Sequence, residues 1–167
     1  MQYLSVEHQK LLGQRYKTAA IIVFAFCVSV LIYMLVAKFI TPKEIMPGSE
    51  TWQQPVYSAV IVLGVVVVAL RRIMLSKMMI GTATQRGVAA VLQHLLTMTI
   101  IICALAEIAA IGGLAFYLLT GDPQYSWRLG VVSIFLLLYT FPRRGEWERA
   151  VAESANLQSG ATAQVAR

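Results

Sequence analysis

Long apolar stretches alternate with short polar segments along this chain of 167 residues. A helix rises 1.5 Å per residue, so about 20 apolar residues cross the roughly 30 Å of hydrocarbon in a bilayer. The pattern therefore predicts an all-α fold, an integral membrane four-helix bundle. The four apolar stretches predict helices at about 18–40, 55–76, 92–119 and 127–142.

The ends of the apolar stretches indicate how the helices connect. The first stretch exceeds the about 7–15 residues of a signal-peptide core and lacks a small-x-small cleavage site, so we expect a retained helix. Thr120-Gly121-Asp122-Pro123 is a turn signal between the last two stretches. We expect the last two helices to pair as a hairpin, and the first two likewise.

Composition supports the membrane interpretation. Hydrophobic residues make up 58% of the chain and charged residues 13%, with a mean hydropathy of +0.69. Soluble domains carry about 25% charged residues. The net charge of +6 comes from basic residues at the ends of the apolar stretches, which favours a membrane over nucleic acid as partner. Cys27 and Cys103 lie inside apolar stretches, where we expect reduced packing residues.

The distribution of basic residues predicts the orientation. Of the 14 Lys and Arg, three lie in the N-terminal tail, four between the second and third apolar stretches and four after the fourth helix. The positive-inside rule then places both termini in the cytoplasm, as in a multi-pass protein of the bacterial cytoplasmic (inner) membrane. The domain boundaries are a cytoplasmic tail at 1–17, the four-span domain at 18–144 and a second cytoplasmic tail at 145–167.

Aromatic and basic residues flank the predicted spans. Trp sits favourably at the level of the lipid headgroups, and Lys or Arg side chains reach toward them. We expect seven such interface anchors, namely Trp52, Arg71, Arg72, Trp127, Arg143, Arg144 and Trp147.

Glu107 is the acidic residue inside a predicted span, near the middle of the third helix. An ionised carboxylate there costs about 2.5–3.5 kcal/mol on insertion scales. We expect protonation, a hydrogen-bond partner or burial against another helix. By depth alone, the candidate partners are Ser29, Tyr33 and Tyr57.

Small residues on the third helix predict a packing face. Residues at this helical spacing share one stripe, and small side chains allow helix backbones to approach closely. The predicted packing residues are Thr99, Cys103, Ala106, Ala109, Ala110 and Gly113, with Glu107 at the edge of the stripe.

Residues 56–119 resemble the hairpin of proteolipid subunit c of rotary ATP synthases. The resemblance rests on Gln85-Arg86-Gly87, an apolar stretch, and then Ala104-Leu105-Ala106-Glu107-Ile108-Ala109-Ala110-Ile111-Gly112-Gly113-Leu114. It implies that Glu107 is the proton- or sodium-binding carboxylate and Arg86 the basic residue of the cytoplasmic loop. The chain departs from that family in its first hairpin helix, which has only Gly64 in place of a glycine run, and in its flanking helices.

The segment Ala-x-Ala-Glu-x-x-Ala-x-x-Gly-Leu and the short last helix ending in Pro-Arg are also similar to small bacterial four-helix membrane proteins. A transmembrane haem usually needs two axial ligands at matched depth, and His8, in the tail, is not positioned to pair with His94 at the cytoplasmic end of the third span. We predict no metal site, no cofactor and no enzymatic activity.

Three functions remain open from the sequence. The leading hypothesis is a small non-catalytic accessory or structural subunit of a membrane complex, whose partners are membrane lipids and other membrane subunits or further copies of the chain. The alternative is a proton- or cation-handling proteolipid-like protein that uses Glu107. A weaker third hypothesis is a haem or quinone site near His94.

Overall fold

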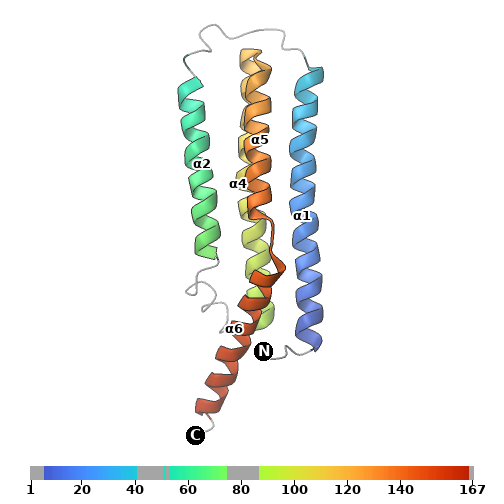
Figure 1. Cartoon of the computed structure of the whole chain (residues 1–167), viewed down its shortest axis with the longest axis vertical. Coiled ribbons are helices and arrows are strands. Elements are labelled where there is room, and N and C mark those ends of the chain that lie inside the picture. Colours follow the sequence, from blue (N-terminus) through green and yellow to red (C-terminus); the bar gives the residue numbers. More distant parts are fainter. Residues whose placement is uncertain (1–5, 41–50, 52, 75–86, 166–167) are drawn as a thin grey trace.

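The structure is a computed structural model that describes residues 6–40, 51, 53–74 and 87–165. Four of its helices stand side by side, and the last one continues from the lower end of the group (Figure 1). The all-α prediction is confirmed. Within the described residues the helices are α1 (Val6–Phe39), α2 (Gln53–Met74), α4 (Val88–Thr120), α5 (Pro123–Thr140) and α6 (Arg144–Val165).

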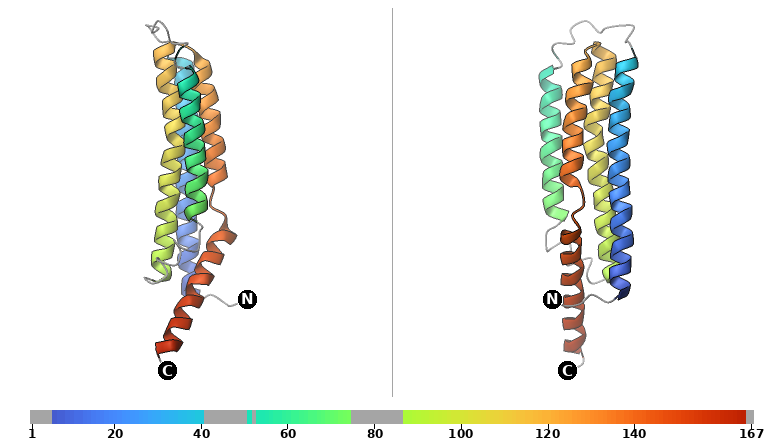
Figure 2. Two further views of the ribbon diagram at one scale, coloured as in Figure 1. Left: turned by 90° about the vertical axis from the view of Figure 1, so that its left-hand side faces the viewer. Right: turned by 45° about the vertical axis from the view of Figure 1, so that its right-hand side comes forward.

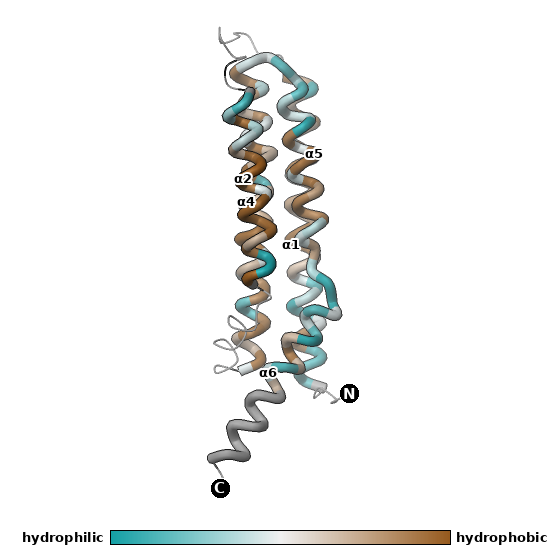
Figure 3. The backbone as a smooth tube through the Cα atoms, turned by 60° about the vertical axis from the view of Figure 1, so that its left-hand side comes forward, coloured by the Kyte–Doolittle hydropathy of each residue, from teal (hydrophilic) through white to brown (hydrophobic). Residues whose placement is uncertain are grey.

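Three of the described helices, α1, α2 and α4, are long and apolar enough to cross a membrane. Hydrophobic residues dominate the middle of the upright helices, and hydrophilic residues gather toward their ends (Figure 3). Large apolar side chains such as Phe24 of α1 and Ile61 of α2 point outward. Such outward faces suit a hydrocarbon environment, because lipid tails solvate them without a hydration cost.

α4 is the central helix of the group. It contacts α1, α2, α5 and α6, whereas α1 and α2 lie on opposite sides of the α4–α5 pair (Figures 1 and 2). The prediction that the last two helices pair is confirmed, and the prediction that the first two pair is wrong. Only Gly121 and Asp122 separate α4 from α5, so these helices must be neighbours. The stretch between Ile40 and Gln53 is long enough to reach across the group.

The turn between α4 and α5 has the cap at each helix end that its sequence predicts. Gly121 adopts a left-handed conformation with φ of 72°, and its N–H donates to the Tyr117 carbonyl at 2.8 Å. Asp122 caps α5, because its Oδ1 accepts from the Gln124 N–H at 2.9 Å, and Pro123 occupies the first turn. These caps satisfy backbone groups that a helix end leaves without partners.

Small residues bring α4 and α5 close together. A Cβ at Gly113 would lie 2.8 Å from the Leu129 Cβ and 3.0 Å from the Tyr125 carbonyl oxygen. The buried Ser133 hydroxyl of α5 donates to the Ala106 carbonyl of α4 at 2.7 Å. The pair is therefore held by backbone proximity and by one interhelical hydrogen bond.

The lower end of the structure has its own apolar core, formed by the first halves of α1 and α4, the start of α6 and Val67 of α2. This core explains why α1 begins at Val6 and α4 at Val88, earlier than the expected 18 and 92. The apolar stretches mark only the part of each helix that is suited to hydrocarbon. The helices themselves extend further, into segments that contain both apolar and polar residues. The buried residues are Leu12, Ala19, Val67, Val88, Val91, Leu92, Leu95, Leu96, Ile102, Trp147, Ala150 and Val151.

We predict opposite effects of alanine at two adjacent glycines of α4. Gly113→Ala places a methyl group against α5 and should lower the free energy of unfolding by about 1–3 kcal/mol through overpacking. Gly112→Ala is the matched control, because its Cβ would meet nothing within 4 Å. Alanine there should leave stability unchanged or raise it by up to about 1 kcal/mol. Thermal unfolding of the purified protein in detergent measures both, and equal losses would contradict the close approach.

Candidate functional site: a carboxyl held between α1 and α4

Glu107 lies on α4 and meets two hydroxyl groups of α1. The Ser29 Oγ donates to Glu107 Oε1 at 2.5 Å, and the Tyr33 hydroxyl donates to the same oxygen at 2.9 Å. Ser29 and Tyr33 are four residues apart, so one face of α1 presents both hydroxyls to α4. A carboxylate oxygen offers about two lone-pair sites, and these two donors use both on Oε1.

An apolar cluster surrounds this contact. Buried residues from α1, α4 and α5 form it, and Tyr33 itself packs against it. A hydrogen bond in such surroundings contributes modestly when made, but an unpaired polar group there costs about 1–3 kcal/mol. The buried members of the cluster are Val23, Val30, Cys103, Ala106, Ala110 and Leu137.

The sequence placed three hydroxyl residues at the depth of Glu107, and the structure brings two of them to it. The third, Tyr57, lies near the start of α2, at the upper end of the structure (Figure 1). Its hydroxyl accepts from Arg128 Nη1 at 3.1 Å, and its ring stacks on Tyr125 with centroids 6.1 Å apart. Tyr57 therefore fastens α2 to α5 and has no part in the carboxyl site.

The six residues expected to form the packing face of α4 are all buried. Cys103, Ala106 and Ala110 belong to the apolar cluster formed with α1 and α5. Ala106 accepts the Ser133 hydrogen bond, Gly113 admits α5, and the Thr99 hydroxyl donates to the Leu95 carbonyl of its own helix at 2.8 Å. Glu107 is partly exposed at the edge of this face, on the side that meets α1.

The expected interface anchors fall into two groups. Trp127, Arg72, Arg143 and Arg144 are exposed, whereas Arg71 and Trp147 are turned toward the protein. Trp147 is 1% exposed, and its ring meets Tyr16 edge to face at 6.2 Å. A ring buried in this way contacts α1 and not a headgroup layer. Trp52 lies outside the described residues, as does Arg86 of the subunit c resemblance.

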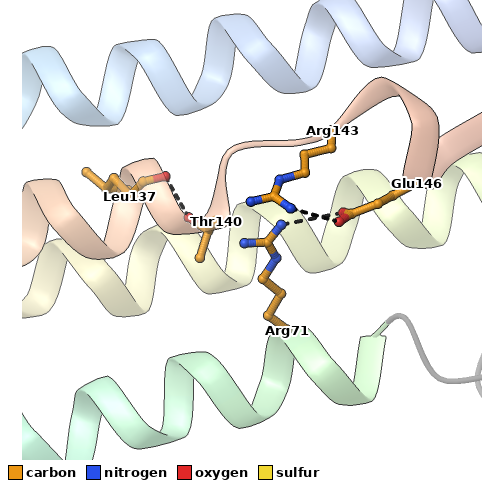
Figure 4. Close-up of polar contacts among 5 residues, drawn as sticks. All are labelled: Arg71, Leu137, Thr140, Arg143 and Glu146. Atoms are coloured by element: carbon orange, nitrogen blue, oxygen red, sulfur yellow. Dashed lines mark hydrogen bonds and ion pairs between the residues drawn. The ribbon is translucent and has the colours of Figure 1, made fainter.

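Arg71 is held in a polar cluster at the lower end. Its Nη2 lies 3.4 Å from Glu146 Oε2, and its guanidinium carbon lies 4.6 Å from the centroid of the Tyr139 ring. Arg143 approaches the other oxygen of the same carboxylate at 3.9 Å. Figure 4 shows the two arginines reaching Glu146 from different segments. The cluster joins α2 to the start of α6.

The docking of α6 is a feature that the sequence reasoning missed. Residues 145–167 were expected only as a cytoplasmic tail, whereas residues Arg144–Val165 form α6. Trp147, Ala150, Val151 and Ser154 are buried. Their spacing of three and four residues is the signal of a helix with one packed face.

His94, the centre of the haem or quinone hypothesis, lies on α4. Its Nε2 is buried and has no hydrogen-bond partner in the described part of the chain. No group of three His, Cys, Asp or Glu residues within that part is arranged to hold a metal ion. Cys27 and Cys103 are both free thiols.

No protein-family model, no curated protein and no solved structure matches this chain. The resemblance to subunit c therefore rests on the sequence alone, on Gln85-Arg86-Gly87 and the segment around Glu107.

Two substitutions of Glu107 separate its hydrogen-bonding role from its charge. Glu107→Gln keeps an acceptor oxygen for both hydroxyls, so the free energy of unfolding should change by less than about 1 kcal/mol. Glu107→Leu leaves both donors without an acceptor and should cost about 1–3 kcal/mol. Thermal unfolding in detergent compares the two variants, and equal stability of the Leu and Gln variants would contradict the observed hydrogen bonds.

Proposed function

We propose that this chain is a small non-catalytic integral membrane protein that serves as an accessory or structural subunit of a membrane complex. The observation that carries the proposal is the contact between Glu107, Ser29 and Tyr33, in which the acidic residue of the spans joins two helices. The Ser133 hydroxyl of α5 likewise joins two helices, because it donates a hydrogen bond to the Ala106 carbonyl of α4. Polar groups of the apolar region thus fix the positions of helices.

The proposed topology has four spans, with both termini on the cytoplasmic face of a bacterial inner membrane. The start of α1 and the end of α6 lie at the same end of the structure, which supports an even number of crossings (Figure 1). α5 has 18 residues, about 27 Å of helix, and would be the shortest span. The excess of Lys and Arg at that end supports its placement in the cytoplasm.

The proposed partners are other membrane subunits or further copies of this chain. α2 supports this, because among its described residues only Val56, Val67 and Arg71 are buried. The rest of α2 offers an apolar surface that lipid or a neighbouring helix can cover. The buried residues of α4 pack against the other helices and leave the outward face of α2 available for such an assembly.

Extraction in a mild detergent tests this proposal. The protein should leave the membrane together with partner subunits or as a homo-oligomer, with a mass above that of one 18.4 kDa chain. Size-exclusion chromatography with light scattering measures the mass, and mass spectrometry identifies co-purified proteins. A single monomeric species at several detergent concentrations would count against an accessory role.

A second function, proton or cation handling at Glu107, is supported by one specific observation. A carboxyl oxygen and two hydroxyl oxygens converge within hydrogen-bond distance. Oxygen atoms are the ligands that hard cations prefer, and a carboxyl group also carries a proton. This second function uses the same three residues as the first. It requires the ionisable carboxyl group of Glu107 as well as the hydrogen bonds that Glu107 accepts.

The two proposed functions differ in what Glu107→Gln does. If Glu107 carries a proton, dicyclohexylcarbodiimide should label it between pH 5 and 8, and Glu107→Gln should abolish proton flux in proteoliposomes while leaving the fold stable. If Glu107 is only a structural contact, Glu107→Gln behaves as wild type. The absence of both labelling and flux in the wild-type protein would eliminate ion handling and leave the accessory role standing.

A further inference from the structure

Four arginines gather at the lower end of the structure, where α2 ends and α6 begins. Arg71 and Arg72 belong to the last turn of α2, Arg143 lies between α5 and α6, and Arg144 is the first residue of α6. In Figure 4 the guanidinium groups of Arg71 and Arg143 approach one carboxylate, that of Glu146. Two segments far apart in the sequence thus place like charges next to each other.

The shared carboxylate does not saturate the two guanidinium groups. Arg71 Nη2 lies 3.4 Å from Glu146 Oε2, and Arg143 Nη1 lies 3.9 Å from Glu146 Oε1. Both separations exceed the about 2.7–2.9 Å of a charge-assisted hydrogen bond. Two guanidinium groups carry about ten N–H donors, and one carboxylate offers about four lone-pair sites. The geometry leaves donors for a second anion.

The neighbouring charges do not remove this imbalance. Arg144 Nε pairs with Glu148 Oε1 at 2.8 Å, and Arg72 is exposed. The four guanidinium groups thus meet two carboxylates, those of Glu146 and Glu148, within the described residues. A surplus of two positive charges attracts an anion at neutral pH.

One of the arginines is fixed and the other is accessible. Arg71 is 7% exposed and lies over the Tyr139 ring, so its guanidinium is already oriented. The side chain of Arg143 is 72% exposed and can close on a ligand. A planar guanidinium held in place recognises two oxygens of a phosphate at once, which a flexible ammonium does not.

The surroundings of the cluster are those of a lipid headgroup. The apolar stretches of α2 and α5 end at these arginines, so the cluster lies where hydrocarbon gives way to headgroups. Leu138, which directly precedes the Tyr139 that Arg71 contacts, is an exposed apolar side chain on the hydrocarbon side of the arginines, where acyl chains can cover it. We propose that Arg71 and Arg143, supported by Arg72, bind the phosphate of an anionic glycerophospholipid. This inference does not depend on the role of Glu107.

Lipid titration of the full chain, followed by native mass spectrometry, tests the proposal. The wild-type protein in neutral detergent should bind phosphatidylglycerol at least about fivefold more tightly than zwitterionic phosphatidylcholine. Arg143→Gln should weaken phosphatidylglycerol binding about fivefold, which corresponds to the contribution of one arginine near a membrane surface. Because Arg143 is exposed, its replacement should leave the thermal midpoint unchanged.

Arg149→Gln is the matched control, since it removes the same charge from an exposed position of α6. It should change the affinity less than about twofold. Arg149 lies six residues beyond Arg143, about 9 Å further along the helix, and charges beyond a Debye length of about 8 Å are largely screened at physiological salt. Equal weakening by Arg143→Gln and Arg149→Gln would show general charge attraction and overturn the site. Equal binding of the two lipids by the wild-type protein would overturn it as well.

Inorganic phosphate distinguishes a lipid from a soluble anion. Added as a competitor at millimolar concentration, it should not displace phosphatidylglycerol, because it has no acyl chains to contact Leu138. Full displacement would assign the cluster to a soluble anion and overturn the lipid proposal. Arg72→Gln provides a second exposed variant, which should weaken lipid binding in the same direction as Arg143→Gln.

Discussion

The close contact of α4 with α5 is the constraint on which the rest of the structure depends. Gly113 allows the α5 backbone to approach, and Ser133 donates to the Ala106 carbonyl one residue before Glu107. With this face of α4 occupied by α5, the adjacent edge is left to α1. Glu107 lies on that edge. It therefore contacts Ser29 because α1 is the helix that packs against this side of α4.

Polar contacts hold α2 at its two ends, while most of its middle faces outward. At the upper end Tyr57 meets Arg128 and Tyr125, and at the lower end Arg71 meets Glu146 and Tyr139. Between these ends the packing of α2 rests on apolar contacts alone, which bring no hydrophobic gain within a bilayer because lipid tails solvate the same surface. The polar ends therefore decide where α2 sits.

The sequence predicted the features that depend on one helix at a time. Apolar stretches located the helices, Gly121 and Asp122 located the turn, and depth identified Ser29 and Tyr33 as partners of Glu107. Features that depend on several helices escaped it. The separation of α1 from α2 follows from a long connection that fixes no neighbour. Trp147 was assigned to headgroups because its partner Tyr16 lies more than a hundred residues away, beyond the reach of periodicity.

The attachment of α1 bears on what Glu107 can do. Above the carboxyl, Met34 of α1 fills the space over Gly130, and the Tyr117 hydroxyl donates to the Ile40 carbonyl. Below it, Tyr16 packs against Trp147. A carrier site needs two arrangements of its ligands, and a helix held on both sides of the site resists such a change. This is why we rank the structural role of Glu107 above ion handling, which would require α1 to release contacts at both levels.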